Sequence, residues 1–289
     1  MTYIKDGVLE TTIGGVRGIL AARRANPVVL VPTMGALHRG HIELVEEARR
    51  LATPSGTVVA SIFVNARQFG PTEDFGVYPR DLDGDVAKCE AAGADVVFAP
   101  EPGEVYRPDA SIDVRELSLS KLLCGVSRPG HFEGVCLVVL KLFNITRPTA
   151  AVFGKKDRQQ LAIIERMGRD LDLEVAIIGV ETVRESDGLA MSSRNAYLTP
   201  EQRRQAPEIR RALLDAAAQC RAGERNAATL IGRARASLES DAPLGRVDYL
   251  EVVDATNMQH IESVTEPAVM AVAYFFDQCR IIDNIDLNP

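Results

Sequence analysis

Short apolar runs alternate with helical patterns through the first part of this chain. The runs have the length of buried strands, and the segments between them place apolar residues at helical spacing. Such alternation predicts an α/β protein with a parallel, doubly wound sheet. The expected strands cover residues 27–31, 57–64, 94–99, 150–153 and 173–180. The expected helices start near residue 41, cover 82–92 and 134–145, and follow the apolar spacing between 161 and 171.

The pattern changes after Val183, where a polar segment begins. This segment leads into Thr-Pro-Glu-Gln at residues 199–202, a capping box with proline at the first helical position. Amphipathic helices are expected over residues 201–221 and 226–239, and β-rich segments follow them. The sequence therefore predicts two domains, residues 1–183 and a smaller α+β domain at 184–289.

Composition narrows the classes of function. The 289 residues carry a net charge of -7 and a pI near 5.3, which argues against a nucleic-acid surface but leaves room for a small anionic substrate. No apolar run approaches the roughly 20 residues that span a bilayer, and no signal peptide is recognisable at the N-terminus. The five cysteines are widely spaced and odd in number. We therefore expect a cytoplasmic protein with reduced thiols, no membrane association and no structural zinc.

Two of the four histidines stand three residues apart in the segment Val31–His41. His38 and His41 follow an expected strand and open an expected helix, at the sheet edge where open α/β folds bind ligands. Helix N-termini attract phosphate, and Gly35 and Gly40 would let the backbone approach a ligand closely. The alternative is a pair of surface histidines on a loop. The position in the fold favours a phosphate site.

Polar residues also follow two of the other expected strands. Asn65 and Gln68 have amides that both donate and accept, which suits a hydroxy acid. Lys155 and Lys156 would meet phosphates, and Asp157 would accept from ribose hydroxyls. The ordinary alternatives are a turn at a strand end and a solvated helix start.

Three further groups of polar residues lie between the expected elements. Gln160 falls on the face of Asp157 and Lys156 if the helix has begun there. Ser192, Ser193 and Arg194 form a loop that suits a phosphate clamp, or else an ordinary polar linker. Arg128 and His131 precede a buried helix, and a phosphate role and a loop role remain equally open for them.

Taken together, these segments resemble the pantothenate synthetase (pantoate–β-alanine ligase) family. The resemblance runs through nearly the whole chain in the family's order, whereas H-x-G-H alone also marks other nucleotidyl-transferring enzymes. The matching blocks are PTMGALHRGH, SIFVNARQFGPTEDF, YPRDLDGD, SRPGHFEGV, FGKKDRQQL, VRESDGLAMSSRNAYL and RIIDNI.

The resemblance implies a Rossmann-like domain that binds ATP and pantoate, with a C-terminal lid, in a homodimer. It implies two chemical steps. The pantoate carboxylate attacks the α-phosphorus of ATP, which gives pantoyl adenylate and pyrophosphate. The amine of β-alanine then attacks the acyl carbon, which gives pantothenate and AMP. Mg²⁺ is expected to bridge phosphate oxygens.

The resemblance also implies roles for individual residues. His41 matches the family's proton donor, and His38, Lys156 and Arg194 complete the expected catalytic set. Pantoate and β-alanine would contact Asn65, Gln68 and Gln160. The expected ATP-binding residues are Met34, Gly35, Ala36, Leu37, His38, Arg39, Gly40, His41, Gly154, Lys155, Lys156, Asp157, Val183, Met191, Ser192, Ser193 and Arg194.

Several positions depart from the family pattern. The family usually has N-P-x-Q-F, whereas this chain has Ala66 and Arg67 between the asparagine and the glutamine. Arg158 stands where an aromatic residue is usual, and Arg39 stands where the residue is often acidic. In some relatives, acidic and amide residues after Y-P-R have been linked to the metal. The corresponding residues here are Gly84, Asp85 and Lys88, so no protein metal site is expected.

Two alternatives remain beside the ligase. Another H-x-G-H adenylyl- or cytidylyltransferase would act on a different acid or phosphate and need no β-alanine. The glutamine pair, Gln68 and Gln160, favours a small hydroxy acid instead. A nucleotide-sensing binding protein of the same fold is the second alternative, and the two histidines together with Lys156 and Arg194 argue against it.

Overall fold

The computed structural model describes residues 2, 3, 7–23, 25–71 and 73–288. The chain divides into two compact units. The first unit comprises Met1–Glu116, Arg128–Lys155 and Ile163–Glu181, and the second comprises Leu117–Ser127, Lys156–Ala162 and Thr182–Pro289. The predicted boundary fell between residues 183 and 184. The last boundary between the two units lies two residues earlier, before Thr182. Two short segments that come earlier in the chain, 117–127 and 156–162, also belong to the second unit.

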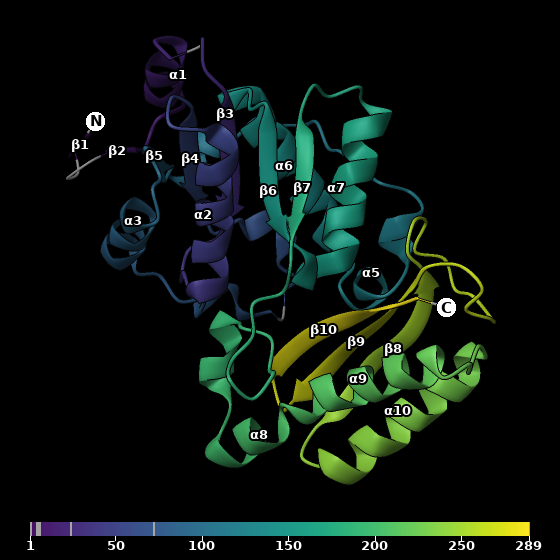
Figure 1. Ribbon diagram of the computed structural model, residues 1–289. Coiled ribbons are helices and arrows are strands. Elements are labelled where there is room, and N and C mark those ends of the chain that lie inside the picture. Colours follow the sequence, from purple (N-terminus) through teal and green to yellow (C-terminus); the bar gives the residue numbers. More distant parts are fainter. Residues whose placement is uncertain (1, 4–6, 24, 72, 289) are drawn as a thin grey trace. The chain divides into compact units, whose positions relative to one another are not determined.

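In the described part of the first unit, seven strands form one sheet in the order β1-β2-β5-β4-β3-β6-β7 (Figure 1). Every neighbouring pair is parallel except β1 with β2. Strands buried on both faces read as continuous apolar runs, which is why β3 and β4 are so rich in valine. The strands are β1 (Thr2–Tyr3), β2 (Val8–Glu10), β3 (Val28–Thr33), β4 (Thr57–Ile62), β5 (Val96–Phe98), β6 (Ala150–Gly154) and β7 (Ala176–Val180).

The prediction of a doubly wound parallel sheet is confirmed. From β3 the chain proceeds to β4 and β5 on one side, and later to β6 and β7 on the other. The order therefore reverses beside β3, and in open α/β sheets ligands bind at such a reversal, beyond the carboxyl ends of the strands. The loops that follow β3 and β6 leave this edge, because the two strands are parallel neighbours.

Helices cover the sheet of the first unit. Val45 and Ala48 of α2 pack against Val29 and Val31 of β3, while Leu30 between them is fully buried toward the opposite face. Helix α6 is preceded by Gly130, whose φ of +82° lies in the left-handed region. The helices that follow or precede these strands are α1 (Ile13–Ala21), α2 (Arg39–Ala52), α3 (Leu82–Ala91), α4 (Pro102–Val105), α6 (His131–Thr146) and α7 (Arg158–Asp170).

The second unit has its own core. In the described residues it holds an antiparallel sheet in the order β10-β9-β8, packed against α9 and α10 (Figure 1). This confirms a smaller α+β part. Its elements are α5 (Cys124–Ser127), α8 (Pro200–Gln205), α9 (Glu208–Arg221), α10 (Ala227–Asp241), β8 (Arg246–Asp254), β9 (Ala268–Phe276) and β10 (Cys279–Leu287).

Two details of the second unit differ from the sequence prediction. The capping box at Thr199 and Gln202 is confirmed, but the expected helix over 201–221 is wrong as one element. It ends at Gln205, and a new helix begins at Glu208, because Pro207 lacks the N–H that a continuous helix needs. Strand β10 was not predicted, since Arg280, Asp283 and other polar residues interrupt its apolar positions.

Candidate active site

The loop after β3 carries the two histidines into the start of α2. His38 is the N-cap of α2, and its Nδ1 accepts a hydrogen bond from the backbone of Gly40 at 3.1 Å. The Nδ1 of His41 accepts from the backbone N–H of His38 at 3.3 Å. The two rings lie 4.1 Å apart between centroids. The structure therefore brings the predicted pair together, in a capping box that the sequence reasoning missed.

These hydrogen bonds fix which ring nitrogen carries the proton. Because Nδ1 accepts a backbone N–H in both rings, neutral His38 and His41 carry their proton on Nε2. Each ring can then donate from Nε2 to an anionic oxygen. Protonation of Nδ1 would place a hydrogen against a backbone N–H and break the cap.

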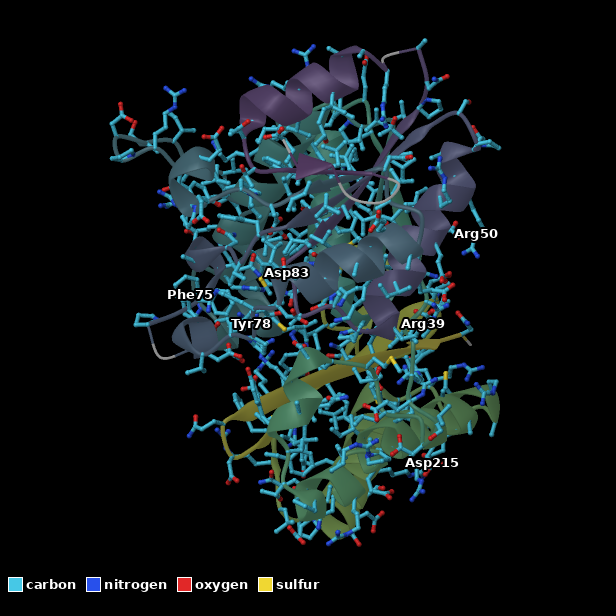
Figure 2. All side chains as sticks on the ribbon, turned by 90° about the vertical axis from the view of Figure 1, so that its left-hand side faces the viewer. Arg39, Arg50, Phe75, Tyr78, Asp83 and Asp215 are labelled. Carbon is cyan, nitrogen blue, oxygen red and sulfur yellow. The ribbon has the colours of Figure 1, made fainter. Side chains whose placement is uncertain are left out.

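Arg39 turns away from this pair. Its guanidinium, half-exposed, contacts Glu43 at 2.9 Å and Glu46 at 2.6 Å along α2. Figure 2 shows Arg39 near one end of α2 and Arg50 near the other. The extra arginine of the H-x-G-H segment is thus neutralised within its own helix.

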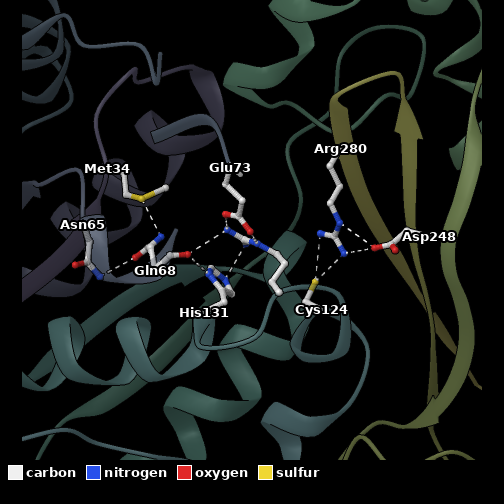
Figure 3. Close-up of polar contacts among 9 residues, drawn as sticks. Met34, Asn65, Gln68, Glu73, Cys124, His131, Asp248 and Arg280 are labelled. Atoms are coloured by element: carbon white, nitrogen blue, oxygen red, sulfur yellow. Dashed lines mark hydrogen bonds and ion pairs between the residues drawn. The ribbon is translucent and has the colours of Figure 1, made fainter. Parts of the chain in front are cut away.

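Asn65 and Gln68 form a buried amide pair after β4 (Figure 3). Asn65 Nδ2 donates to Gln68 Oε1 at 3.1 Å, and Gln68 Nε2 contacts the Sδ of Met34 at 2.9 Å. The hydroxyl of Tyr106 donates to Asn65 Oδ1 at 2.9 Å. A Cβ at Gly134 of α6 would lie only 2.4 Å from the carbonyl oxygen of Arg67, so glycine is needed for this approach.

The backbone carbonyl of Gln68 is held by His131, as Figure 3 shows, and also by Arg128. His131 Nδ1 lies 2.8 Å and Arg128 Nη2 3.3 Å from the Gln68 carbonyl oxygen. Arg128 can only donate, so His131 Nε2 is the acceptor in their 3.0 Å contact, and in the matching tautomer the ring proton lies on Nδ1. The loop role that the sequence left open is the one that these contacts support.

Glu73 completes this network. Both its oxygens bind Arg128, at 2.8 and 2.6 Å. Burial alone would raise the pKa of Glu73, but hydrogen bonding and charge from Arg128 outweigh burial and lower it.

Nearby, Arg67 pairs with Asp113 at 2.7 Å and lies over the Tyr106 ring. Arg67 therefore has partners that are not phosphate.

Gly154 ends β6, and Lys155 follows it at the same carboxyl edge of the sheet as the histidine loop. Lys155 pairs with Glu181 in the same unit. The remaining predicted residues of the nucleotide loop, Lys156 and Asp157, belong to the second unit.

Lys156 has an unusual electrostatic environment. Burial lowers its pKa most, the charge of Asp157 raises it, and that of Arg194 lowers it further, so that the net pKa lies below the ordinary value. The carboxylate of Asp283 also raises it. The Asn284 side chain donates to the Lys156 backbone carbonyl at 3.0 Å. In the second unit, predicted Lys156 and Arg194 are thus electrostatically coupled.

The two adjacent glutamines of α7 behave differently. Gln159 is buried, donates to the carbonyls of Leu119 and Leu122 at 2.7 Å, and accepts from the backbone of Cys124 at 3.0 Å. Gln160, the predicted substrate ligand, is only half-buried. The sequence reasoning missed Gln159, because nothing in the local pattern separates a structural glutamine from a binding one.

The loop of Met191, Ser192, Ser193 and Arg194 is anchored at its end and its base. Asn195 donates to Glu185 Oε1 at 2.7 Å and to the carbonyl of Ala190 at 3.1 Å. Ser192 caps the short helix that follows it. The backbone of Met191 donates to the carbonyl of Val183 at 3.0 Å.

Ion pairs missed by the sequence reasoning hold this part of the second unit. Arg184 binds both oxygens of buried Asp283, at 2.7 and 2.9 Å, and Arg203 pairs with Glu185 at 2.6 Å. Asp283 lies in the block RIIDNI, as does Arg280, which contacts Asp248 at 2.8 Å and Cys124 Sγ at 3.5 Å (Figure 3). That block therefore has a structural role.

The described residues also bear on the expectations about a metal site and a membrane span. They contain no cluster of three or more histidine, cysteine or acidic side chains arranged for a metal ion. Within the same residues, no helix combines the length and apolarity needed to cross a bilayer. All five cysteines are buried, and none of them forms a disulfide.

Comparison with known proteins decides the family. The sequence matches the family described as Pantoate-beta-alanine ligase over residues 9–286. The chain belongs to the pantoate-β-alanine ligase family. The resemblance expected from the sequence is thereby confirmed.

Relatives of this pantoate-β-alanine ligase family member match it over nearly its full length. The pantothenate synthetase of Akkermansia muciniphila is 55% identical over 265 residues, covering 92% of this chain and 94% of that protein. The crystal structure of pantothenate synthetase from Thermus thermophilus has a TM-score of 0.91 at 43% identity and covers 97% of this chain and 99% of that one.

A second ligase structure is described with bound ligands. The pantoate-β-alanine ligase from Francisella tularensis, described as complexed with beta-gamma ATP and β-alanine, has a TM-score of 0.76 at 29% identity. The match covers 96% of this chain and 97% of that one. The ligase reading is favoured over another type of H-x-G-H nucleotidyltransferase.

Proposed function

We propose that this chain joins pantoate to β-alanine at the expense of ATP, through pantoyl adenylate, with release of pyrophosphate and AMP. The observation that carries the proposal is the family match over residues 9–286. The relative from Francisella tularensis, described with β-alanine and an ATP species, supports these two substrates.

In the first step, a carboxylate oxygen of pantoate attacks the α-phosphorus as the bond to the pyrophosphate leaving group breaks. Negative charge then develops on phosphate oxygens. His38 and His41 would donate to these oxygens from Nε2, the nitrogen that their backbone hydrogen bonds leave protonated. Lys156 and Arg194 would supply fixed positive charge, the device that contributes most to catalysis of this kind.

In the second step, the amine of β-alanine attacks the acyl carbon, the acyl carbon–oxygen bond breaks, and AMP departs. Asn65, Gln68 and Gln160 are the proposed ligands for the organic substrates. The contact from Asn65 to Gln68 Oε1 fixes how the Gln68 amide is turned, so its orientation is set before substrate arrives.

The proposed ATP-binding residues divide into two groups according to the unit that contains them. The first contains Met34, Gly35, Ala36, Leu37, His38, Arg39, Gly40, His41, Gly154 and Lys155, and the second contains Lys156, Asp157, Val183, Met191, Ser192, Ser193 and Arg194. Because Arg39 is paired along α2, its proposed contribution is through the backbone.

Mg²⁺ would enter with ATP as part of the substrate. Magnesium keeps several waters and binds chiefly through substrate phosphates and one or two carboxylates. When bound, the ion neutralises phosphate charge. We further propose a homodimer in the cytoplasm, in line with the family resemblance.

The test is AMP formation from ATP and Mg²⁺ with pantoate, measured with and without β-alanine. We expect AMP only when both organic substrates are present, and none with His41→Ala that retains its fold. Transfer of the nucleotide to an acceptor other than pantoate, without any need for β-alanine, would support another H-x-G-H transferase. ATP binding without AMP formation would support a nucleotide sensor.

A further inference from the structure

Asp85 binds the turn that precedes the two histidines. Its side chain is buried near the start of α3, with 1% of its surface exposed. The backbone N–H of Ala36 donates to its Oδ2 at 2.7 Å, and that of Leu37 donates to its Oδ1 at 2.8 Å. Lys88 lies 3.4 Å from Oδ1. One carboxylate thus satisfies two consecutive donors from a segment 48 and 49 residues earlier.

The turn has a conformation that needs such support. Gly35 has a φ of +80° and Ala36 a φ of +50°, and alanine is disfavoured in this left-handed region. A Cβ on Gly35 would lie 3.1 Å from Asp85 Oδ2 and 3.2 Å from Ile62 Cγ2. Glycine therefore allows the carboxylate to approach, and the carboxylate in turn stabilises the strained alanine.

The same contacts limit what the turn can do with a nucleotide. The N–H groups of Ala36 and Leu37 are taken by Asp85, and that of Gly35 lies 3.3 Å from the hydroxyl of Thr33. The N–H of the next residue, His38, is bonded to the other histidine. This turn is therefore a support for the histidine side chains, and its amides are not an open cradle for phosphate.

We propose that Asp85 is a positioning residue for the adenylation step. It acts through the turn at residues 35–37, which follows β3 and sets the position of His38 and His41. The proposal rests on the proposed function, because it assumes that the two histidines contact ATP.

The decisive variant is Asp85→Asn, which keeps the shape but replaces one accepting oxygen by a donor that faces a backbone N–H. We expect kcat/KM for ATP to fall about tenfold, equivalent to about 1.4 kcal/mol. Pantoate-dependent exchange of labelled pyrophosphate into ATP should fall equally. AMP release from synthetic pantoyl adenylate and β-alanine should stay within about twofold of wild type.

The chain offers a matched control. Asp95 also binds a backbone N–H, that of Val58 at 2.7 Å, together with Arg49 at 2.9 Å, at the amino ends of β4 and β5. Asp95→Asn makes the same chemical change at the opposite edge of the sheet. It should lower the melting temperature without changing kcat/KM for ATP. Lys88→Met, which removes only the ion pair, should also leave kcat/KM unchanged.

A rescue experiment separates positioning from general damage. Because glycine adopts a left-handed φ at no steric cost, adding Ala36→Gly to Asp85→Asn should restore part of the lost kcat/KM. If Asp85→Asn does not fold, Gly35→Ala disturbs the same turn from the other side and should produce the same loss in pyrophosphate exchange.

Three results would overturn the proposal while the wild type still makes AMP from all three substrates. They are a wild-type kcat/KM for ATP in folded Asp85→Asn or Gly35→Ala, an equal loss in Asp95→Asn, and an equal loss in both half-reactions. Failure of the wild type itself to make AMP would instead refute the proposed function.

Discussion

At the scale of single residues, His38 combines two tasks that mutation can separate. Its Nδ1 caps α2, and its Nε2 is the proposed donor to phosphate. Asparagine is a good N-cap without an imidazole, whereas alanine is a poor one. We expect His38→Asn to keep the melting temperature near wild type and lower kcat at least tenfold. His38→Ala should lose the same activity and also about 1 kcal/mol of unfolding free energy.

Rate assays with ATP and thermal melts of the two variants check this separation. Equal melting temperatures for His38→Asn and His38→Ala would contradict the capping role. Wild-type kcat in His38→Asn would contradict the donor role.

Lys156 gives a prediction about pH. Burial lowers its pKa, so its charge is lost at a lower pH than the roughly 10.4 of an ordinary lysine. If that charge binds phosphate, kcat/KM for ATP falls as pH rises through this lowered pKa in the free enzyme. In Lys156→Arg the charge persists, so the alkaline fall should move to higher pH or disappear. An unchanged alkaline limb in that variant would assign the limb to another group.

At the scale of elements, the loop that carries Gln68 depends on the Glu73–Arg128 ion pair. The pKa of Glu73 is lowered in the folded state, so the unfolded chain binds a proton more readily. The resulting stabilisation is fully present above the ordinary glutamate pKa of about 4.3 and is lost as pH falls through the lowered value. Glu73→Gln should therefore be less stable than wild type at pH 7, and the difference should narrow on acidification.

Urea unfolding of both proteins at pH 7 and at pH 4 or below measures this difference. The same variant should raise the KM for pantoate more than that for ATP, because Arg128 and His131 hold the Gln68 carbonyl. A difference in stability that widens toward acid would show that another group dominates.

Elements also show where the sequence was informative. Apolar periodicity predicted the strands beside β3, and H-x-G-H at the end of that strand predicted the histidine pair. Neither pattern revealed the structural roles of Asp85, Gln159 and Asp283, because each of them binds a partner that is distant in the chain. Pro207 is sufficient to end a helix, but the amphipathic pattern continues on both sides of it. That pattern led to the prediction of one helix where the structure has two.

At the scale of the whole molecule, the thiols are structural. Burial raises the pKa of Cys89 and of Cys136 to about 12, so neither forms a thiolate readily near neutral pH. All five cysteines are buried. We expect little reaction with a thiol reagent in the native protein at pH 8 and five reactive thiols in denaturant. Rapid labelling of Cys89 or Cys136 in the native state would contradict this packing.

The central claim is that the carboxylate of pantoate attacks the α-phosphorus of ATP. It is tested most directly with pantoate carrying ¹⁸O in its carboxylate, incubated with ATP, Mg²⁺ and β-alanine. The account predicts AMP with one ¹⁸O, since the acyl carbon–oxygen bond breaks in the second step. AMP without label, or label in inorganic phosphate or pyrophosphate, would contradict an acyl adenylate.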